Sequence, residues 1–551
     1  MAFPWENITG GAFVSAVLLA WAKDELTRWS TLNSFLLAWV AWLMAWGVWA
    51  VWVYPLFLSP LRHLPEPSGN HWLFGQGKRI IAQPSGMPMR EWINEIPNDG
   101  VIRYRGLFNQ ERLLIASPKA LAEVLVTNNY AFEKPVQVRW SLGRILGVGV
   151  LLAEGEEHKM QRRNLTPAFA FRQVKNLYPV FWKKACEATR TMTAAFNTEG
   201  ETEVEIMSWA SRATLDIIGV AGMGRDFGAI HNENSPLAKT YRTVFKPSKQ
   251  GQILALLGFI VPLWLVNMIP VQRNDDIHQA ASEIRAVCRD LIREKKDNMT
   301  SKEEAGVDIL SVALESGGFT DENLVNQLMT FLAAGHETTA SALTWAIYML
   351  CRYPKVQSRL REEVRQRLPS LDSDVDITSM DIDRMPYLNA VCSEVLRYYS
   401  PVPITLREAA HDTTILDHPV RKGTRVMLVP WATNFDRELW GPDSEMFNPE
   451  RWLPPLSSTS DGDKSRAAAA ASGGASSNYA FLTFLHGPRS CIGQSFAKAE
   501  FACVLAAWVG RFEFALADPA LEDETKLVIR GGVTARPAQG MHVRVKLVGG
   551  Y

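Results

Sequence analysis

The chain is poor in cysteine and carries no surplus of charge of either sign. Its 551 residues include only 6 cysteines, and no two of them form a CxxC pair. The sequence therefore supports neither the disulfide scaffold of a small secreted domain nor a zinc cluster. Lysine and arginine together number 58, as do aspartate and glutamate, so the formal net charge is zero. That balance argues against a nucleic-acid-binding protein, which usually carries a basic surplus.

Three common enzyme signatures are also incomplete. The run from His336 to Ala340 begins like the zinc-protease motif HExxH, but Ala340 stands where the second histidine ligand is needed. A Gly-x-Gly at 222–224 lacks the third glycine of a dinucleotide fingerprint. The Gly77-Lys78 dipeptide is followed by arginine rather than serine or threonine, so it is no phosphate-binding loop. The chain has no evident nucleotide site of its own.

A long apolar stretch lies near the start of the chain. No charged residue occurs from Thr31 to Leu58, and ~20 apolar residues are enough to cross a bilayer. We predict a transmembrane helix over about residues 35–55 and a proline-rich hinge after it, so that residues 1–62 form a membrane anchor. Tryptophans at 39, 42, 46, 49 and 52 share one stripe of that helix, which favours lipid-facing rings over a packing seam. The uncharged residues 7–22 could be a second span, a re-entrant piece or an interfacial helix.

The remainder, residues 63–551, is predicted to be one catalytic domain that is mainly α with a small β portion. Apolar periodicity and capping residues predict helices at Leu324–Leu350, Pro354–Leu368, Pro386–Tyr399 and Gln494–Val509. Short strand-like runs occur at Val101–Arg105 and Arg112–Ala116, and a small sheet is expected between about 400 and 430. Residues 456–478 are a low-complexity surface insertion.

One cysteine has an unusual setting. Cys491 is preceded by Phe484, Gly487 and Arg489 and followed by Gly493 and a helical run. A thiolate at a helix N-terminus is favoured by the free backbone N–H groups and by the positive end of the helix dipole. Glycines on both sides would let the backbone approach a flat cofactor closely. Without these neighbours, Cys491 would be about equally well explained as a small buried hydrophobe.

The pattern resembles the heme-ligand loop of the cytochrome P-450 superfamily, FxxGxRxCxG, and all five fixed positions match. Four further pieces of the chain resemble the family: the run from Ala334 to Thr339, Glu394-x-x-Arg397, the run from Phe447 to Trp452, and the run from Gly155 to Arg162. Two of them depart from the family pattern, because Trp452 ends a turn that is PERF in the family, and His158 replaces the family's tryptophan. The resemblance covers the chain from about residue 60 to its end and implies the cytochrome P-450 fold.

The resemblance also implies a cofactor and its surroundings. Cys491 would be the axial ligand of heme b, iron protoporphyrin IX, within a loop that includes Phe484, Gly487 and Gly493. The side chains implied to pair with the two heme propionates are His158, Arg162, Arg407 and Arg489, since charge-assisted bonds to carboxylates are strong. Arg407 could equally be a solvated charge at the end of a strand.

The resemblance gives two further groups of residues a role. Thr338 and Glu337 would deliver protons to dioxygen. A mid-helix threonine by default bonds the carbonyl four residues earlier, but a Glu-Thr pair in an otherwise apolar helix is harder to explain by packing. Glu394, Arg397 and Arg451 would form a buried network that supports the heme loop, although Glu394 and Arg397 alone would more commonly be a surface ion pair.

The activity implied is that of a heme-thiolate monooxygenase that oxidises a lipophilic small molecule. Its electrons would come from an NADPH-dependent reductase that docks near the basic residues Lys159, Arg163, Arg172 and Lys175, which could also be only a solvated helix side. The form of the cysteine loop looks most like fungal biosynthetic members that act on terpenoid, polyketide or alkaloid skeletons. The catalytic domain is expected on the cytosolic side of the endoplasmic reticulum membrane. An isomerase or dehydratase that needs no dioxygen, and a heme sensor, remain as alternatives.

A second apolar stretch, Gln252 to Val271, is interrupted by Pro262 and Pro270. It is too broken for a comfortable transmembrane span. A buried core helix is one explanation, but we favour a segment that rests in the bilayer surface, because in the resembling family this region covers the mouth of the substrate channel.

Overall fold

The structure is a computed structural model that describes residues 5–21, 31–82, 84–196, 201–245, 249–258, 261, 263–300, 308–373, 375–454, 472–531 and 533–551. Contacts divide the chain into two compact units. The first comprises Met1–Gln83, Glu91–Glu133 and Leu406–Leu428, and the second comprises Pro84–Arg90, Lys134–Thr405 and Val429–Tyr551. The division that the sequence predicts at residue 62 stays a prediction.

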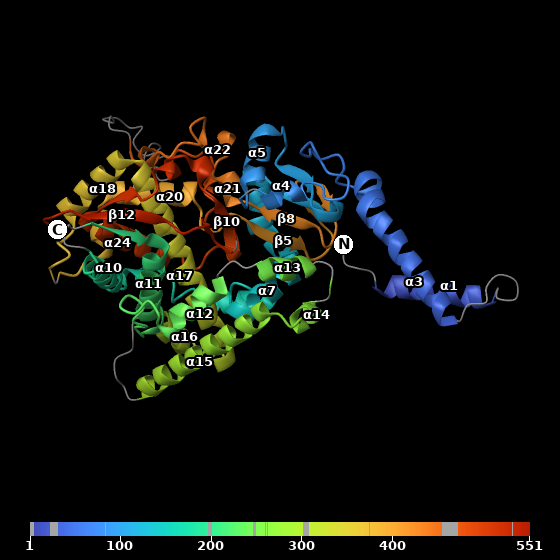
Figure 1. Ribbon diagram of the computed structural model, residues 1–551, viewed down its shortest axis with the longest axis horizontal. Coiled ribbons are helices and arrows are strands. Elements are labelled where there is room, and N and C mark those ends of the chain that lie inside the picture. Colours follow the sequence, from blue (N-terminus) through green and yellow to red (C-terminus); the bar gives the residue numbers. More distant parts are fainter. Residues whose placement is uncertain are drawn as a thin grey trace. The chain divides into compact units, whose positions relative to one another are not determined.

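The first unit begins with apolar helices, drawn in blue in Figure 1. Helix α1 (Trp5–Trp21) precedes α3 (Thr31–Val48), which continues directly into the π-helical segment η1 (Trp49–Leu58). Residues Leu32–Leu58 are long and apolar enough to cross a membrane, whereas Glu6–Leu19 is shorter. The predicted apolar helix around residues 35–55 is thus confirmed, and it extends further in both directions.

Two tryptophans of the apolar stripe make packing contacts. The Trp42 Nε1–H donates to Ser15 Oγ on α1 at 3.0 Å, and a Cβ on Gly11 would lie only 2.9 Å from the Trp42 ring. Further along, the Trp52 ring stacks on Trp72 with centroids 5.8 Å apart. The sequence predicts rings that face lipid and does not predict these contacts, because it does not reveal that α1 packs along α3.

A five-stranded sheet completes the first unit, with strand order β1-β2-β8-β5-β3. Its members are β1 (Val101–Arg105), β2 (Glu111–Ile115), β3 (Phe132–Glu133), β5 (Thr405–Ala409) and β8 (Arg425–Leu428), and β6 (Thr413–Ile415) pairs with β7 (His418–Val420). The helices are α4 (Gly77–Ala82) and α6 (Pro118–Ala122), and α5 (Met87–Glu95) has residues in both units. Arg103 on β1 donates to the Pro55 carbonyl, so the end of the apolar helix is bonded to this sheet.

Helices make up most of the second unit, which confirms the mainly α fold class. They are α7 (Val136–Leu146), α8 (Gly155–Leu165), α9 (Phe171–Lys175), α10 (Tyr178–Thr193), α11 (Ile206–Ile217), α12 (Pro236–Phe245), α13 (Lys249–Leu257), α14 (Leu263–Met268), α15 (Gln272–Thr300), α16 (Ile309–Glu315), α17 (Asp321–Arg352), α18 (Pro354–Arg367), α19 (Ser379–Asp383), α20 (Pro386–Tyr398), α21 (Pro430–Thr433), α22 (Arg437–Trp440) and α24 (Gln494–Arg511). A small sheet has the order β4-β12-β9, formed by β4 (Glu201–Glu205), β12 (His542–Leu547) and β9 (Phe512–Leu516), and β10 (Ile529–Gly531) pairs with β11 (Ala535–Pro537).

The longest helix, α17, forms the centre of this unit and packs against α11, α15, α20 and α24 (Figure 1). It begins as the sequence predicts, because the Thr320 side chain accepts the Asn323 N–H at 3.3 Å and two acidic residues follow in the first turn. All four predicted helices of the body are confirmed to within a few residues. Most of the low-complexity insertion, residues 456–471, lies outside the described residues.

Candidate active site

The cysteine loop is a tight structure directly before α24. The Cys491 N–H donates to the Phe484 carbonyl at 2.9 Å, which closes the loop. Gly487 has a φ of 74°, a conformation that glycine adopts without cost. Leu485 has a φ of 56°, and the left-handed region costs a residue with a side chain about 1–2 kcal/mol. Backbone strain of this kind clusters at functional sites.

The Cys491 side chain is accessible although many protein atoms surround it. Burial among protein atoms raises the pKa of the thiol, while the Gly493 N–H and the charge of Arg162 act in the opposite direction. The residue is nevertheless exposed, in contrast to Cys503, which is fully buried within α24. The accessible Cys491 thiol can therefore meet a bound group, whereas the Cys503 thiol cannot.

A partly accessible strip, called the open face below, lies on α17. Between residues 327 and 350 of this helix, only Ala334, Gly335 and Thr338 are not buried. They are one helical turn apart and therefore share a face. The Thr338 hydroxyl donates to the Ala334 carbonyl at 2.8 Å, as a mid-helix threonine commonly does, and its oxygen can still accept a further bond.

The aromatic ring of Phe169 links the cysteine loop to α17. A Cβ on Gly493 would lie 3.7 Å from this ring, which is an ordinary contact. The same ring meets Phe331 of α17 edge to face, with centroids 5.3 Å apart. Helices α17 and α24 also pack against each other. Packing by the protein therefore does not explain why a glycine stands at 493.

The neighbouring acid, Glu337, is oriented differently from Thr338. Its side chain is buried, and its Oε1 accepts bonds from Thr534 Oγ1 and from the Arg536 guanidinium, both at 3.1 Å. Burial raises the pKa of Glu337, and Arg536 and Thr534 partly offset that rise. Glu337 and Thr338 are adjacent in sequence, but their side chains bond different partners.

Two of the predicted propionate residues lie around the cysteine loop. The Arg162 guanidinium donates to the Ser490 carbonyl at 2.5 Å, so α8 is bonded to the residue before Cys491. Arg489 is buried in an ion pair with Glu154, whose other oxygen accepts the Lys134 N–H at 2.9 Å. His158, also on α8, is buried.

A buried network of charged residues lies at the end of α20. Glu394 and Arg397 are both fully buried and form a bidentate pair with two bonds of 2.8 Å. The Arg451 Nε–H donates to Glu394 at 3.2 Å. The remaining Arg397 donors reach the carbonyls of Asn434, Ser444 and Met446 at 2.7–2.8 Å. The structure thus brings these three charged side chains together in the interior and excludes a surface ion pair.

Comparison with known proteins decides the family. A family model described as Cytochrome P-450 matches residues 65–540 of the chain. The chain belongs to the cytochrome P-450 family. It is 48% identical to the cytochrome P-450 monooxygenase FUM15 of Gibberella moniliformis, with 91% of this chain and 90% of that protein covered. It is 47% identical to the monooxygenase sphH of Aspergillus fumigatus, with the same coverage. For the monooxygenase ALT8 of Alternaria alternata, identity is 44%, with 92% and 93% covered. The chain is therefore a cytochrome P-450 monooxygenase.

The residues present fit the heme that the P-450 family implies. The fit rests on an accessible thiol that lies deep in the protein and on a glycine at 493 that no protein contact requires. Among the described residues, no group of three or more His, Cys, Asp or Glu side chains could hold a metal ion. Heme brings its own metal and takes one cysteine ligand from the protein.

Arg407 is the one predicted site residue in the first unit. It lies in β5, is buried, and donates to the Leu406 carbonyl at 2.8 Å. The sequence alternative of a solvated strand-end charge is wrong, because Arg407 is only 2% exposed.

Sequence reasoning missed four residues of this P-450. Glu154, Thr534 and Arg536 bond to predicted site residues from other segments, and no spacing in the sequence indicates those contacts. Trp452 was noticed only as a departure from the family's PERF turn. Its Nε1–H donates to Glu394 at 2.9 Å, so the exchange of phenylalanine for tryptophan adds a donor to the buried network.

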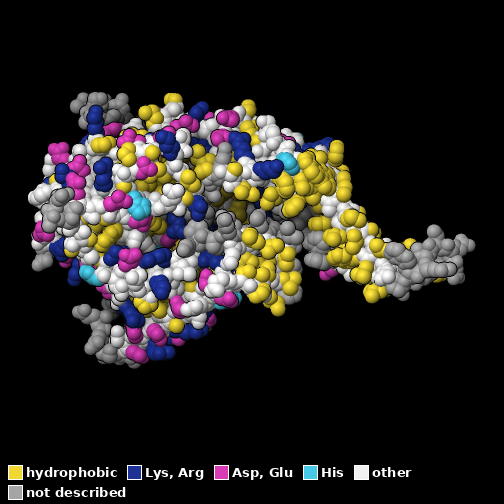
Figure 2. All heavy atoms as spheres, viewed as in Figure 1, with side chains coloured by type: hydrophobic (Ala, Val, Ile, Leu, Met, Phe, Trp, Pro, Cys, Tyr) yellow, Lys and Arg dark blue, Asp and Glu magenta, His cyan; other side chains and the backbone are white. Residues whose placement is uncertain are grey.

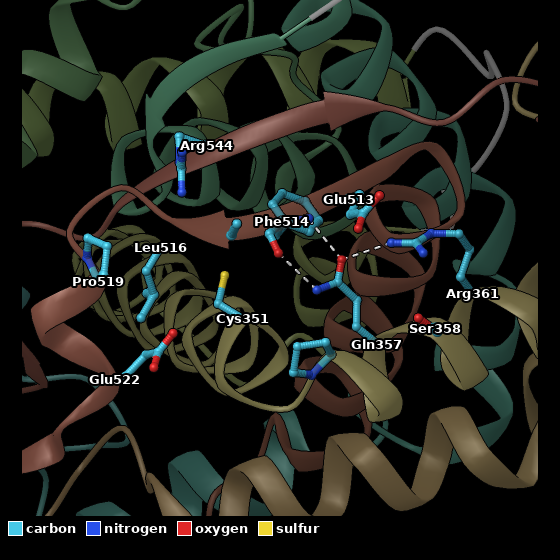
Figure 3. A pocket seen from close by; sticks show the side chains of 12 residues that line it. Cys351, Gln357, Ser358, Arg361, Glu513, Phe514, Leu516, Pro519, Glu522 and Arg544 are labelled. Carbon is cyan, nitrogen blue, oxygen red and sulfur yellow. Dashed lines mark hydrogen bonds between the residues drawn. The ribbon is translucent and has the colours of Figure 1, made fainter.

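The pocket in Figure 3 is separate from these residues. It lies where α18 begins beside β9 and β12, and it is lined by residues that include Cys351, Gln357 and Arg361. The Gln357 side chain bonds the Phe514 N–H and carbonyl at 2.8 and 3.0 Å and accepts a bond from Arg361. Because these bonds tie α18 to β9, we assign this pocket a structural role.

Proposed function

We propose that this P-450 activates dioxygen and oxidises a lipophilic small molecule, with electrons from an NADPH-dependent, flavin-containing reductase. The observation that carries the proposal is the deep but accessible Cys491 thiol at the end of a complete FxxGxRxCxG loop. Heme bound through a thiolate supplies the oxidising chemistry, since the thiolate pushes electron density that favours O–O cleavage.

The residues of this chain would hold the cofactor as follows. Cys491 would be the iron ligand, and Phe484, Gly487 and Gly493 would surround it. The propionates would pair with His158, Arg162, Arg407 and Arg489. Arg489 already pairs with Glu154, but a guanidinium has five N–H donors and can serve a second carboxylate. Glu394, Arg397 and Arg451 would keep the surrounding segments in place.

Three further observations bear on the substrate class, the partner and the membrane. The related monooxygenases named above come from fungi, which supports a role in fungal biosynthesis of terpenoid, polyketide or alkaloid products. Lys159, Arg163, Arg172 and Lys175 are all exposed, as a reductase-docking surface requires. The apolar helix at Leu32–Leu58 supports an anchor in the endoplasmic reticulum membrane with the catalytic part in the cytosol.

Co-expression with a reductase tests the proposal. The full chain should convert a metabolite of the host extract with matching consumption of NADPH and dioxygen, and the Cys491→Ser chain should not. Conversion without any use of NADPH or dioxygen would favour a heme-thiolate isomerase or dehydratase. Heme binding without conversion of any compound would favour a sensor.

Thr338→Ala is expected to uncouple the enzyme. Its hydroxyl lies on the open face of α17, where it can hold and pass on a proton. Without it, we expect NADPH and dioxygen to be consumed at a similar rate but the product per NADPH to fall about tenfold or more, with hydrogen peroxide formed instead. The measurement is product, peroxide and NADPH in one reaction. Thr344→Ala is a control, because this buried threonine of α17 also bonds a carbonyl of its own helix. An unchanged product yield for Thr338→Ala would assign Thr338 a packing role only.

The segment of α13 and α14 is proposed to rest on the bilayer surface. Ile253 is 57% exposed and Met268 is 71% exposed. Figure 2 shows hydrophobic side chains gathered on the surface where Figure 1 places α14. Val266 of the same helix is buried, so the segment also packs on the protein. The side chains of Leu256 and Phe259, at the middle of the predicted segment, lie outside the described residues.

A chain without residues 1–60 should therefore still bind liposomes. Ile253→Asp together with Met268→Asp should lower that binding about 100-fold, since each buried aliphatic side chain contributes about 1.5 kcal/mol. Heme content should be unchanged. Val528→Asp, at a position that is 58% exposed, is the control. Truncated protein that never binds liposomes, or a double variant that loses heme, would contradict membrane contact by this segment.

A further inference from the structure

Glu337 is held by a segment near the C-terminus. Thr534 and Arg536, which place their donors on one carboxylate oxygen of Glu337, lie before and within β11. Thr534 is buried and the Arg536 side chain is 21% exposed. The carboxylate is thus turned toward β11, whereas the adjacent Thr338 borders the open face of α17.

The same guanidinium also contacts α12. Arg536 donates to the carbonyl of Phe245, which is the last residue of that helix. The Phe245 and Tyr241 rings both contact the ring of His336, with centroids 6.2 and 4.8 Å apart. The C-terminal turn of α12 therefore meets the residue directly before Glu337 and shares an arginine with Glu337 itself.

A simpler explanation is that Arg536 only caps α12, since arginines bind favourably at the negative end of a helix. A second arginine, however, already fills that role. Arg273 donates to the Thr243 carbonyl at 2.9 Å and also to the Val244 carbonyl. Arg273 makes no contact with Glu337 among the bonds of the described residues. Arg273 thus only caps α12, whereas Arg536 contacts both α12 and Glu337, so variants of the two arginines distinguish the two roles.

Arg536 is also the charged group that faces Glu337. Burial favours the uncharged form of the other titratable groups nearby. Burial lowers the pKa of His336 on α17 to about 4 and raises the pKa of Tyr241 on α12 and of Glu500, which lies beside Thr339 on α24. Burial favours the protonated form of Glu337, and Arg536 favours its carboxylate.

We propose that Arg536 is a positioning residue that holds the Glu337 carboxylate and links it to the C-terminal turn of α12, so that displacement of α12 releases the acid for proton delivery. The inference rests on the proposed role of Glu337 in the oxidation. If the turn of α12 moves and takes the guanidinium with it, the buried carboxylate loses the one cation that bonds it among the described residues, and burial then favours its protonated form. A substrate that displaces α12 would therefore favour the protonated form of Glu337, the acid next to Thr338 in sequence.

Infrared difference spectroscopy of the resting, heme-containing protein tests this link without turnover. The C=O band of protonated Glu337 is identified by its absence in Glu337→Gln, and its pH midpoint is measured. Arg536→Gln should raise that midpoint by about one pH unit or more, because an opposite charge within a few ångström commonly shifts a carboxyl pKa by 1–3 units. Arg536→Lys, which keeps the charge, should give a smaller rise. If Arg536→Gln does not accumulate, Arg536→Lys decides: a rise of its midpoint that is absent in Arg273→Gln supports the inference, and an unchanged midpoint overturns it.

Two control arginines make the result specific. Arg273→Gln removes the other cap of α12, and Arg530→Gln removes the arginine paired with Arg536 across β10 and β11. Both should leave the Glu337 midpoint unchanged. A midpoint that does not move in Arg536→Gln, or that moves equally in Arg273→Gln, overturns the inference.

Product formation separates failure of this inference from failure of the proposed function. If the wild-type protein never consumes NADPH with a substrate, the proposed function fails, while the infrared midpoints still decide whether Arg536 holds Glu337. If the enzyme is active and Glu337→Gln lowers the product per NADPH, the pH at which coupling is lost should move upward in Arg536→Gln and not in Arg273→Gln. An unchanged profile in Arg536→Gln overturns the link to proton delivery.

Discussion

Cys491→Ser should abolish both the thiolate-type ferrous–carbonyl spectrum and product formation. The cysteine loop offers a single sulfur at the end of a strained, hydrogen-bonded turn, and a serine hydroxyl cannot act as a thiolate ligand. The measurement is the Soret position of the reduced protein with carbon monoxide, together with heme content.

Cys503→Ala is the matched control for this experiment. Cys503 lies in α24, the helix that follows the loop, and is fully buried there. Burial raises the pKa of its thiol well above the usual value. Its replacement should leave the spectrum unchanged and cost stability only. A thiolate-type Soret shift that survives in Cys491→Ser would assign the iron ligand elsewhere.

Glu394→Ala should destabilise the catalytic part by about 3–5 kcal/mol, because it leaves the fully buried Arg397 without its charge partner. The same carboxylate also accepts bonds from Arg451, Trp452 and the Asn448 N–H. The apparent midpoint of thermal unfolding and the retained heme are the readouts. In the part of the chain that the structure describes, none of these residues bonds the cysteine loop directly, so the variant should lose heme only when the protein unfolds and not before.

A surface ion pair gives the control for Glu394. Glu450 pairs with Arg359, and both side chains are about half exposed. Glu450→Ala should therefore change stability by less than about 1 kcal/mol. Trp452→Phe, which restores the family's usual residue, should cost about 1–3 kcal/mol, since it removes one donor to a buried charge. Equal stability of Glu394→Ala and Glu450→Ala would show that the network does not support the fold.

Features within one continuous segment could be predicted well. The α17 helix was found from its apolar periodicity and its Thr320 cap, and the cysteine loop from five positions within ten residues. The apolar helix before residue 58 was found from the absence of charge. In each case the residues that determine the feature are neighbours in sequence, so the spacing alone carries the information.

The neighbours that a side chain contacts could not be predicted in this way. The tryptophan stripe is predicted to face lipid, and Trp42 is 45% exposed, but Trp42 also bonds α1 and Trp52 stacks on Trp72. Arg407 was allowed a solvated position, yet it is buried in β5. The choice between these possibilities depends on which element packs alongside, and periodicity within one element does not determine that.

The sequence alone determined the family, the iron-ligand candidate Cys491 and the Glu337-Thr338 pair, because each depends on short, fixed spacings. Only the tertiary structure decided how that pair is used. It turned Thr338 to the open face of α17 and Glu337 toward Thr534 and Arg536, which are 197 and 199 residues away in the chain. A buried carboxylate must find its donors wherever the fold provides them, and in this protein the packing of β11 and α12 against α17 provides Arg536.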